Sequence, residues 1–178
     1  MSNYRRDFTQ GGTYFFTVVL QDRTKDYLVS HIDLFRFAYK KTLERYPFKT
    51  IAICILPDHF HLIMKLPDGD DNFSARIAYL KTVFSQSLPD HYREQRSSQL
   101  KRREAGIWQR RFWEHLIRNE KDLANHIDYI YYNPVKHQYV NCVKDWLFSS
   151  FHRDVRAKLY PIDWGNSVDM KIRNLYKE

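Results

Sequence analysis

The sequence predicts one α+β domain in which an antiparallel sheet of the ferredoxin-like or RNA-recognition type carries helices on one face. The predicted elements follow the order strand, helix, strand, strand, helix, strand, helix. The 178 residues suffice for an apolar core without disulfides or a structural metal. With 43% apolar and 28% charged residues the composition is that of a globular chain, and five glycines exclude a collagen-like or linker-like one.

The first half of the chain carries four of these elements. Tyrosine, phenylalanine, threonine and valine favour a strand over Thr13–Leu20. Apolar residues at helical spacing predict a helix over Ile32–Tyr46. The run Phe48–Leu56 is too apolar to have a solvent face, so we expect a central strand there. The turn residues Pro57-Asp58 then predict a hairpin that pairs this strand with Phe60–Leu66.

Three further elements follow. An N-cap at Asn72 predicts a helix that runs to about residue 88, and the polar, basic segment 89–106 predicts a loop or a short helix. A fourth strand is expected over Trp113–Ile117. Asn119 has the capping pattern of a last helix, which we expect to end at Asn133-Pro134 because the residue before a proline disfavours helical geometry.

Charge and aromatic content indicate a class of partner. The chain has 29 basic and 21 acidic residues, a formal net charge of +8 and a pI near 9.4. Residues 93–118 alone contain eight basic and three acidic side chains. Basic side chains can bind the phosphates of a nucleic acid, and aromatic side chains, which make up 16% of the residues, can stack on its bases. The composition therefore indicates a nucleic acid as a partner. A basic surface without such a partner explains the composition equally well.

Cysteine usage and hydropathy predict the compartment. Cys54 and Cys142 are the only cysteines, and we expect small buried apolar residues in a reducing environment. The N-terminus lacks the apolar core of a signal peptide, and no apolar run approaches the roughly 20 residues that span a bilayer. We therefore expect a cytoplasmic protein without a membrane segment.

The segment His59-Phe60-His61 is the sharpest local motif. On a strand, His59 and His61 point to the same face while Phe60 enters the core, so the two imidazoles are expected to project outward together. Paired imidazoles form half of a metal site. Two histidines on a solvated strand face are nevertheless the commoner meaning of such a pattern.

A second motif lies on the last predicted helix. Tyr129 and Asn133 are four residues apart and therefore share a helix face. The amide oxygen of asparagine can complete the ligand set of a metal, and a phenol one turn away can attack a group that the metal holds. From the pattern alone, packing tyrosines and a helix end before proline are the favoured interpretation.

Taken together, these motifs resemble the single-tyrosine transposases of the HUH class, named for histidine, a bulky hydrophobe and histidine. The resemblance is closest to the bacterial branch associated with repetitive extragenic palindromes (REP). It covers most of the chain, in the family's order and spacing, and the basic segment 93–103 matches least. The matching segments are Tyr4-Arg5-Arg6, Gly11–Leu20, Leu56–His61, Trp108–His115, Asp128–His137 and Asp145–Trp164.

The resemblance assigns roles to these residues. It implies that His59, His61 and Asn133 bind Mg²⁺ or Mn²⁺. It implies that Tyr129 is the nucleophile, which forms a 5′-phosphotyrosine and releases a 3′-hydroxyl. The two later tyrosines of the block are expected to pack.

The resemblance also implies the substrate and the organisation of the chain. The substrate would be single-stranded DNA hairpins of the REP type, cut and rejoined near the nucleoid by a monomer or a homodimer. Residues 1–134 would form the transposase domain, and residues 135–178 a tail that packs on the body and contacts DNA. The candidate DNA contacts are Arg5, Arg6, Arg110, Arg111, Lys136, His152 and Arg153.

Two other functions are compatible with the residues. One is a non-catalytic protein that stacks single-stranded nucleic acid on an RNA-recognition-type sheet. The other, less well supported, is a structural zinc protein, because a closed zinc site needs four ligands and only three residues are expected to converge. Metal-dependent covalent trapping of DNA separates the enzyme from the binding module, and metal content after purification tests for zinc.

Overall fold

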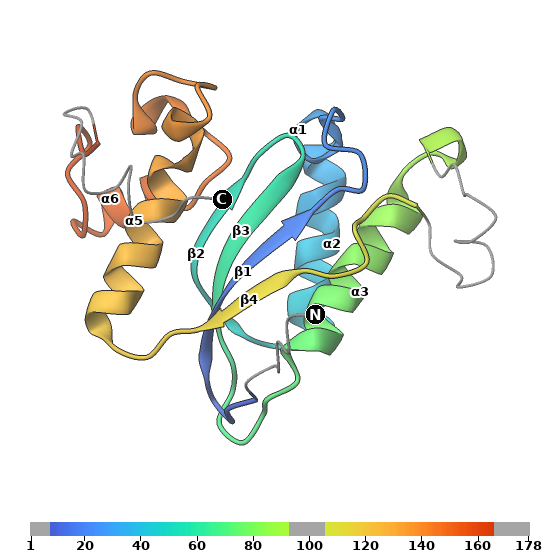
Figure 1. Cartoon of the computed structure of the whole chain (residues 1–178), viewed down its shortest axis with the longest axis horizontal. Coiled ribbons are helices and arrows are strands. Elements are labelled where there is room, and N and C mark those ends of the chain that lie inside the picture. Colours follow the sequence, from blue (N-terminus) through green and yellow to red (C-terminus); the bar gives the residue numbers. More distant parts are fainter. Residues whose placement is uncertain (1–7, 93–105, 166–178) are drawn as a thin grey trace, which may run out of the picture.

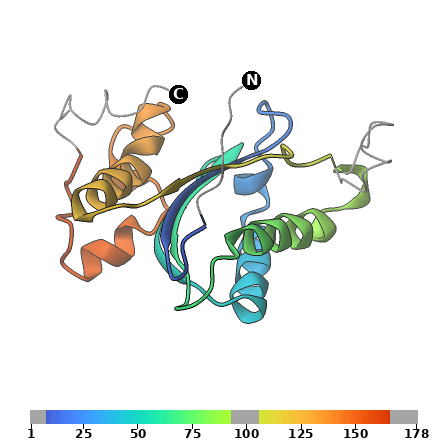
Figure 2. The same cartoon turned by 60° about the horizontal axis from the view of Figure 1, so that its bottom comes forward.

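The computed structural model describes residues 8–92 and 106–165, and these residues form three layers. A four-stranded sheet lies in the middle (Figure 1). Helices α2 (Ile32–Arg45) and α3 (Phe73–Ser87) cover one face of the sheet. Helix α5 (Glu120–Lys136) and the C-terminal segment lie on the other side, as a second view also shows (Figure 2).

The sheet has the strand order β2-β3-β1-β4, and each neighbouring pair is antiparallel. Its strands are β1 (Thr13–Val19), β2 (Lys49–Ile55), β3 (His59–Lys65) and β4 (Trp113–Leu116). Strands β2 and β3 form the expected hairpin. This order, with the helices in their predicted places, confirms the α+β, ferredoxin-like fold class.

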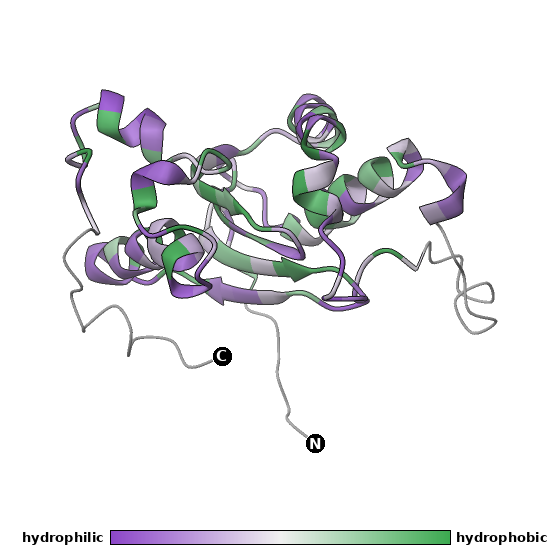
Figure 3. Cartoon of the chain, turned by 90° about the horizontal axis from the view of Figure 1, so that it is seen from above, coloured by the Kyte–Doolittle hydropathy of each residue, from purple (hydrophilic) through white to green (hydrophobic). Residues whose placement is uncertain are grey.

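An aromatic core joins the sheet to α2 and α3. The ring of Phe35 on α2 contacts Phe60 on β3 and Phe84 on α3, at centroid distances of 5.2 and 6.0 Å. Asn72 caps α3 as predicted, because its side-chain oxygen accepts a hydrogen bond from the backbone N–H of Ala75 (3.0 Å). Both helices present one apolar face to the sheet and one polar face to solvent. In Figure 3 this appears as hydrophobic and hydrophilic colours that alternate along the helices.

The short segments complete the described chain. They are helix α1 (Tyr27–Ser30), the 3₁₀ turns η1 (Asp90–Tyr92) and η2 (Val143–Asp145), and helix α6 (Phe151–Arg156). Turn η1 lies in segment 89–106, where we expected a loop or a short helix, and residues 93–105 of that segment lie outside the described residues; the other three elements were not predicted. Cys54 is buried as expected, and burial raises the pKa of its thiol. Among the described residues, no helix combines the length and the apolar character that crossing a bilayer requires.

Helix α5 differs from its predicted extent. It passes through Pro134 and ends at Lys136, whereas we expected it to stop at Asn133-Pro134. Proline removes one backbone hydrogen bond from a helix. The six residues 129–134 are all buried against the sheet and the C-terminal segment, and this packing outweighs the lost bond.

Strand β2 lies at the edge of the sheet, so the expectation of a central strand is wrong. The tail covers this edge instead. The backbone N–H of Ser150 donates to the carbonyl of Ile53 (2.8 Å), and that of Ile55 donates to Phe148 (2.8 Å). The Trp146 indole N–H also donates to the carbonyl of Ile55 (3.1 Å). The apolar composition of β2 thus reflects burial under α5 and the tail rather than a second strand neighbour.

The core around Phe35 generates a stability prediction. We expect Phe35→Ala, which truncates a side chain only 1% exposed, to lower the free energy of unfolding by about 3–5 kcal/mol. Phe37→Ala on the same helix is the matched control, because that side chain is 48% exposed and should change stability by less than about 0.5 kcal/mol. Urea denaturation followed by circular dichroism measures both. Equal losses would contradict the described packing of α2.

Candidate active site

The two histidines of β3 lie on the face of the sheet opposite Phe60, and both are buried. The alternation is as predicted, since Phe60 enters the core beneath α2. His59 is 1% exposed and His61 is 0% exposed, so the expected solvent-facing direction is wrong. The reason is tertiary: α5 packs over this face of the sheet (Figure 1), where the Tyr129 ring contacts His61 and the His137 ring, just after the helix, contacts His59.

Each imidazole is oriented by a bond at its Nδ1 atom. The Nδ1–H of His59 donates to the carboxylate of Asp58 (2.7 Å), which Arg23 also contacts (2.8 Å). The Nδ1 of His61 is hydrogen-bonded to the hydroxyl of Thr17 on β1 (3.0 Å). Among the described residues, neither buried Nε2 atom has a hydrogen-bond partner. The Asp58 carboxylate can only accept, so the proton of a neutral His59 lies on Nδ1 and its Nε2 lone pair is available for an electrophile. The Nε2 lone pair of His61 is available in the same way when its Nδ1–H donates to Thr17.

Asn133 adds an amide to this pair of histidines. It lies one turn after Tyr129 on α5, is fully buried, and contributes its side chain to the surroundings of His61. Neither its amide oxygen nor its amide nitrogen forms a hydrogen bond to any described residue. Unsatisfied buried polar atoms cost about 1–3 kcal/mol each, so a cluster of them indicates a ligand.

Tyr129 lies beside the same histidines. Its ring centroid is 5.1 Å from that of His61 and 5.9 Å from that of Phe15 on β1. The Lys136 ammonium, two helical turns later, is 4.9 Å from the centre of the Tyr129 ring. Tyr131 instead points to the tail, where its hydroxyl donates to the carboxylate of Asp154. The tertiary structure therefore brings one tyrosine of the block to the histidines.

The electrostatics of the site favour the neutral form of His61. Burial lowers the pKa of His61 well below its usual range, and the neighbouring basic groups His59, His137 and Lys136 further disfavour a positive charge on this ring, while the Asn133 side chain opposes the shift. Burial alone would raise the pKa of Asp58, but His59 and Arg23 together bring it down to about 2. The carboxylate is thus ionised at neutral pH and holds the ring of His59 in place.

Sequence reasoning missed His137, which also lies at this site. Its ring centroid is 5.4 Å from that of His59. The sequence did carry a signal for it, because His137 follows Asn133 by four residues and therefore shares its helix face. Asp58 and Thr17 were missed as well, since only the fold places a turn and the neighbouring strand at the Nδ1 atoms.

The donor set fits a divalent cation. Two Nε2 atoms and an amide oxygen from β3 and α5 are buried without partners among the described residues, and each is a ligand that divalent metals accept. Each histidine also has the Nδ1 hydrogen bond that commonly orients a metal-ligating imidazole. His59, His61 and Asn133 could therefore hold a metal ion and leave its other positions open.

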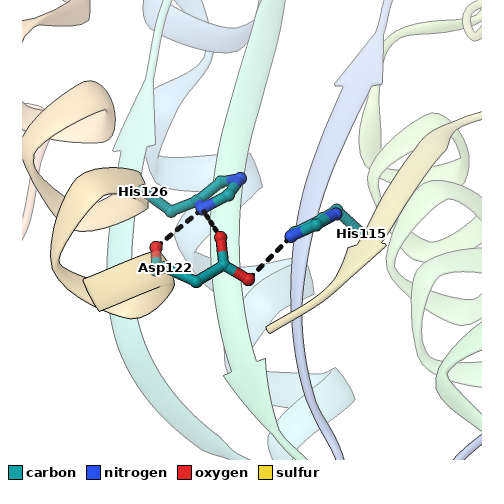
Figure 4. Close-up of side chains that lie close together, drawn as sticks. All are labelled: His115, Asp122 and His126. Atoms are coloured by element: carbon teal, nitrogen blue, oxygen red, sulfur yellow. Dashed lines mark hydrogen bonds and ion pairs between the residues drawn. The ribbon is translucent and has the colours of Figure 1, made fainter. Parts of the chain in front are cut away.

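A second group of possible ligands lies between β4 and α5: His115, Asp122 and His126 (Figure 4). Their ligand atoms lie within 4.8 Å of one another, so the group could hold a metal ion. The Asp122 carboxylate accepts a hydrogen bond from the Nε2–H of His115 (2.9 Å). The Nδ1–H of His126 donates to the backbone carbonyl of Asp122 (2.8 Å) and lies 3.0 Å from its carboxylate. The two imidazoles stack at 4.7 Å with a 16° interplanar angle, so their in-plane lone pairs converge poorly on one point. We therefore describe His115, Asp122 and His126 as a hydrogen-bonded clamp between β4 and α5.

The five candidate DNA contacts that the structure describes lie in different parts of the fold. Arg5 and Arg6 lie outside the described residues. Arg110 and Arg111 are exposed just before β4, at one edge of the sheet.

The other three candidates lie on α5 and α6. Lys136 lies over the Tyr129 ring, within the site. His152 on α6 is half-buried and packs against Phe151, with the ring centroids 5.7 Å apart. The Arg153 guanidinium donates to backbone carbonyls of β2, at the opposite sheet edge from β4, so Arg153 stabilises the cover of that edge.

Comparisons with known proteins agree with this geometry. Residues 12–133 match the family described as "Transposase IS200 like". A Haemophilus influenzae protein whose name contains the words "REP-associated tyrosine transposase" is 68% identical over 97% of this chain and 98% of its own length. The Escherichia coli REP-associated tyrosine transposase is 47% identical over 94% of this chain and 93% of its own.

A solved structure is similar over almost the whole chain. It is described as a REP-associated tyrosine transposase bound to a REP hairpin. It superimposes with a TM-score of 0.79, covers 92% of this chain and 91% of its own, and is 46% identical. This chain belongs to the IS200-like transposase family, among the REP-associated tyrosine transposases, which are enzymes that cleave and rejoin DNA.

Proposed function

We propose that this chain cuts and rejoins single-stranded DNA at REP hairpins through a 5′-phosphotyrosine on Tyr129. The observation that carries the proposal is the position of Tyr129 next to His61, whose ring lies 4.9 Å from that of His59, because the Nε2 atoms of both buried imidazoles have no described partner. The hairpin substrate comes from the similar structure bound to a REP hairpin. The net charge of +8 is compatible with a polyanionic substrate.

His59, His61 and Asn133 would hold the metal ion, for which we propose Mg²⁺ or Mn²⁺. When bound, such an ion polarises the scissile phosphate and offsets the negative charge that develops there. Imidazoles also suit zinc, but a site that keeps positions open for phosphate oxygens suits the oxygen-preferring ions. Asp58 and Thr17 support the site by holding the two histidine rings in the ligating orientation.

Tyr129 would perform the covalent step. Its phenolic oxygen attacks phosphorus, the bond from phosphorus to the 3′ oxygen breaks, and the phenolic proton ends on the released 3′-hydroxyl. The new phosphotyrosine ester keeps the energy of the phosphodiester, so a second 3′-hydroxyl can reverse the step without a nucleotide cofactor. The Lys136 ammonium beside the ring places positive charge near the phenolic oxygen, where negative charge develops during attack.

The site residues belong to β3 and α5 of one chain, so one cleavage needs no second copy. This supports a monomer as the minimal active unit, with the homodimer as the alternative assembly. We propose that the tail adds a DNA contact through His152 and that the enzyme acts in the cytoplasm, at the nucleoid. Its substrate would then be the chromosomal DNA itself.

The covalent step is tested by Tyr129→Phe. We expect this variant to bind a labelled REP hairpin with unchanged affinity and to form no covalent adduct on a denaturing gel, because the attacking oxygen is gone. Tyr132→Phe, which changes a neighbouring tyrosine of the same helix, is the control and should form the adduct at the native level. An adduct in the Tyr129→Phe variant would assign the nucleophile to another residue.

The metal site is tested by removal and return of the ion. Chelation should stop cleavage, and Mg²⁺ or Mn²⁺ should restore it, whereas strict dependence on Zn²⁺ would refute the assignment. His59→Ala should lose cleavage and keep DNA binding. Asp58→Asn should weaken Mn²⁺ binding about 10- to 100-fold, measured by calorimetry, because the ring of His59 loses its charged partner. His152→Ala, outside the site, should bind Mn²⁺ normally.

The charge contribution of the β4 edge is tested by Arg110→Gln together with Arg111→Gln. If both side chains contact phosphates, the slope of log affinity against log salt should become shallower by about 1.4, since each phosphate contact with single-stranded DNA contributes about 0.7. Arg36→Gln on α2, whose side chain is 61% exposed on the other layer, should leave the slope unchanged. An unchanged slope in the double variant would exclude both arginines as phosphate contacts.

A further inference from the structure

Trp113 places an exposed indole on the face of the sheet that carries the active site. It is 47% exposed, in a position at the start of β4. The other described tryptophans, Trp108, Trp146 and Trp164, are buried or half-buried. A large aromatic ring kept in water loses the free energy of burial, so a ring held at a working face indicates a partner.

The register of the sheet fixes where this ring lies. Trp113 pairs with Thr17 on β1, and Thr17 pairs with His61 on β3. Cross-strand partners point to the same face, so Trp113 and His61 share a row. Two interstrand spacings separate their backbones, or about 10 Å. Phe15 fills the space between, with its ring 5.5 Å from Trp113 and 5.9 Å from Tyr129.

The indole is held in place from behind by the clamp between β4 and α5. It is nearly parallel to the His115 ring, with a 4° interplanar angle at 5.9 Å. His115 in turn stacks on His126 at 4.7 Å, and Asp122 accepts a hydrogen bond from each histidine. These contacts restrict the rotation of Trp113 before any ligand arrives, which lowers the entropic cost of binding to it.

The charge around Trp113 selects the chemistry of the partner. Arg110 and Arg111 are exposed and immediately precede β4. An aromatic ring with neighbouring cations is the combination that binds single-stranded nucleic acid, because bases stack on the ring while phosphates meet the cations. An apolar protein partner would not require the two arginines.

We propose that Trp113 is a base-stacking platform that binds a nucleobase of the single-stranded DNA within about three stacked nucleotides of the phosphate attacked by Tyr129. The span follows from the separation of about 10 Å between the backbones of Trp113 and His61, from the Tyr129 ring beside His61 (5.1 Å), and from a stacked rise of about 3.4 Å per nucleotide. This inference rests on the proposed function. By fixing one base, Trp113 would set which phosphate lies at Tyr129, and it is therefore a residue that determines the position of the cut.

The test combines substitution of the ring with removal of single bases from the DNA. The probe is a fluorescently labelled REP hairpin with short single-stranded extensions, synthesised with one abasic site at each extension position in turn. Affinity is measured by anisotropy in the Tyr129→Phe background, where no cleavage interferes. Trp113→Thr keeps a strand-forming residue without a π-face, and Trp113→Phe keeps a smaller ring. Phe37→Ala removes an equally exposed aromatic side chain from α2 and is the matched control.

We expect Trp113→Thr to weaken binding about 5- to 100-fold, and Trp113→Phe and Phe37→Ala to stay within about threefold of the parent. At one extension position, an abasic site should weaken DNA binding by the parent by a similar factor. The same abasic site should cause no additional loss of affinity in Trp113→Thr, because the base has no ring to stack on in that variant. Unchanged affinity of Trp113→Thr, or additive losses at every position, would overturn the proposal. So would an equal loss on a blunt hairpin without extensions.

Two further measurements distinguish a lost stacking contact from misfolding of the variant and from failure of the proposed chemistry. Circular dichroism and thermal midpoint establish whether Trp113→Thr is folded. If it is not, the abasic series on the parent decides, and the absence of any extension base whose loss costs fivefold overturns the proposal. Covalent adduct formation by the unsubstituted chain tests the transposase chemistry independently. If the unsubstituted chain forms the adduct and Trp113→Thr binds DNA with unchanged affinity, the base-stacking role of Trp113 is refuted and the transposase chemistry is not.

Discussion

The packing of α5 on the sheet is the contact on which the rest of this structure depends. It converts one face of β3 from a solvent-facing strand surface into a closed layer and buries both imidazoles of the His-Phe-His motif. The same contact delivers Tyr129 and Asn133, one helical turn apart, to those imidazoles. Stability and assembly of the candidate site therefore have a common origin, because the helix that completes the core also carries Tyr129 and Asn133.

This arrangement leaves polar atoms without partners in a place where they are costly. Each Nδ1 atom of the pair is satisfied, by Asp58 or by Thr17, whereas each Nε2 atom and the amide of Asn133 lack a described partner. Burial makes the neutral form of His61 the favoured one. Such unsatisfied buried atoms lower the stability of the ligand-free protein, and they favour binding of an electrophile that satisfies them.

The two edges of the sheet are tied to the C-terminal half of the chain by different means. At β2 the tail adds backbone hydrogen bonds through Ser150 and Phe148, which satisfies an edge that would otherwise be open. At β4 the carboxylate of Asp122 links His115 on the strand to His126 on α5. Both connections limit movement of α5 relative to the sheet, and so hold the distance between Tyr129 and His61.

Sequence patterns alone were sufficient for the order of the four strands and of helices α2, α3 and α5, for the N-caps at Asn72 and Asn119, and for the alternation that separates His59 and His61 from Phe60. These features depend on short-range periodicity and capping, which neighbouring residues determine. Only the tertiary structure decided that β2 is an edge strand, that α5 continues through Pro134, and that the histidines are buried. Each of these depends on which surface packs over a segment, and the covering residues lie up to about a hundred positions away in the chain, as Ser150 does from Ile53.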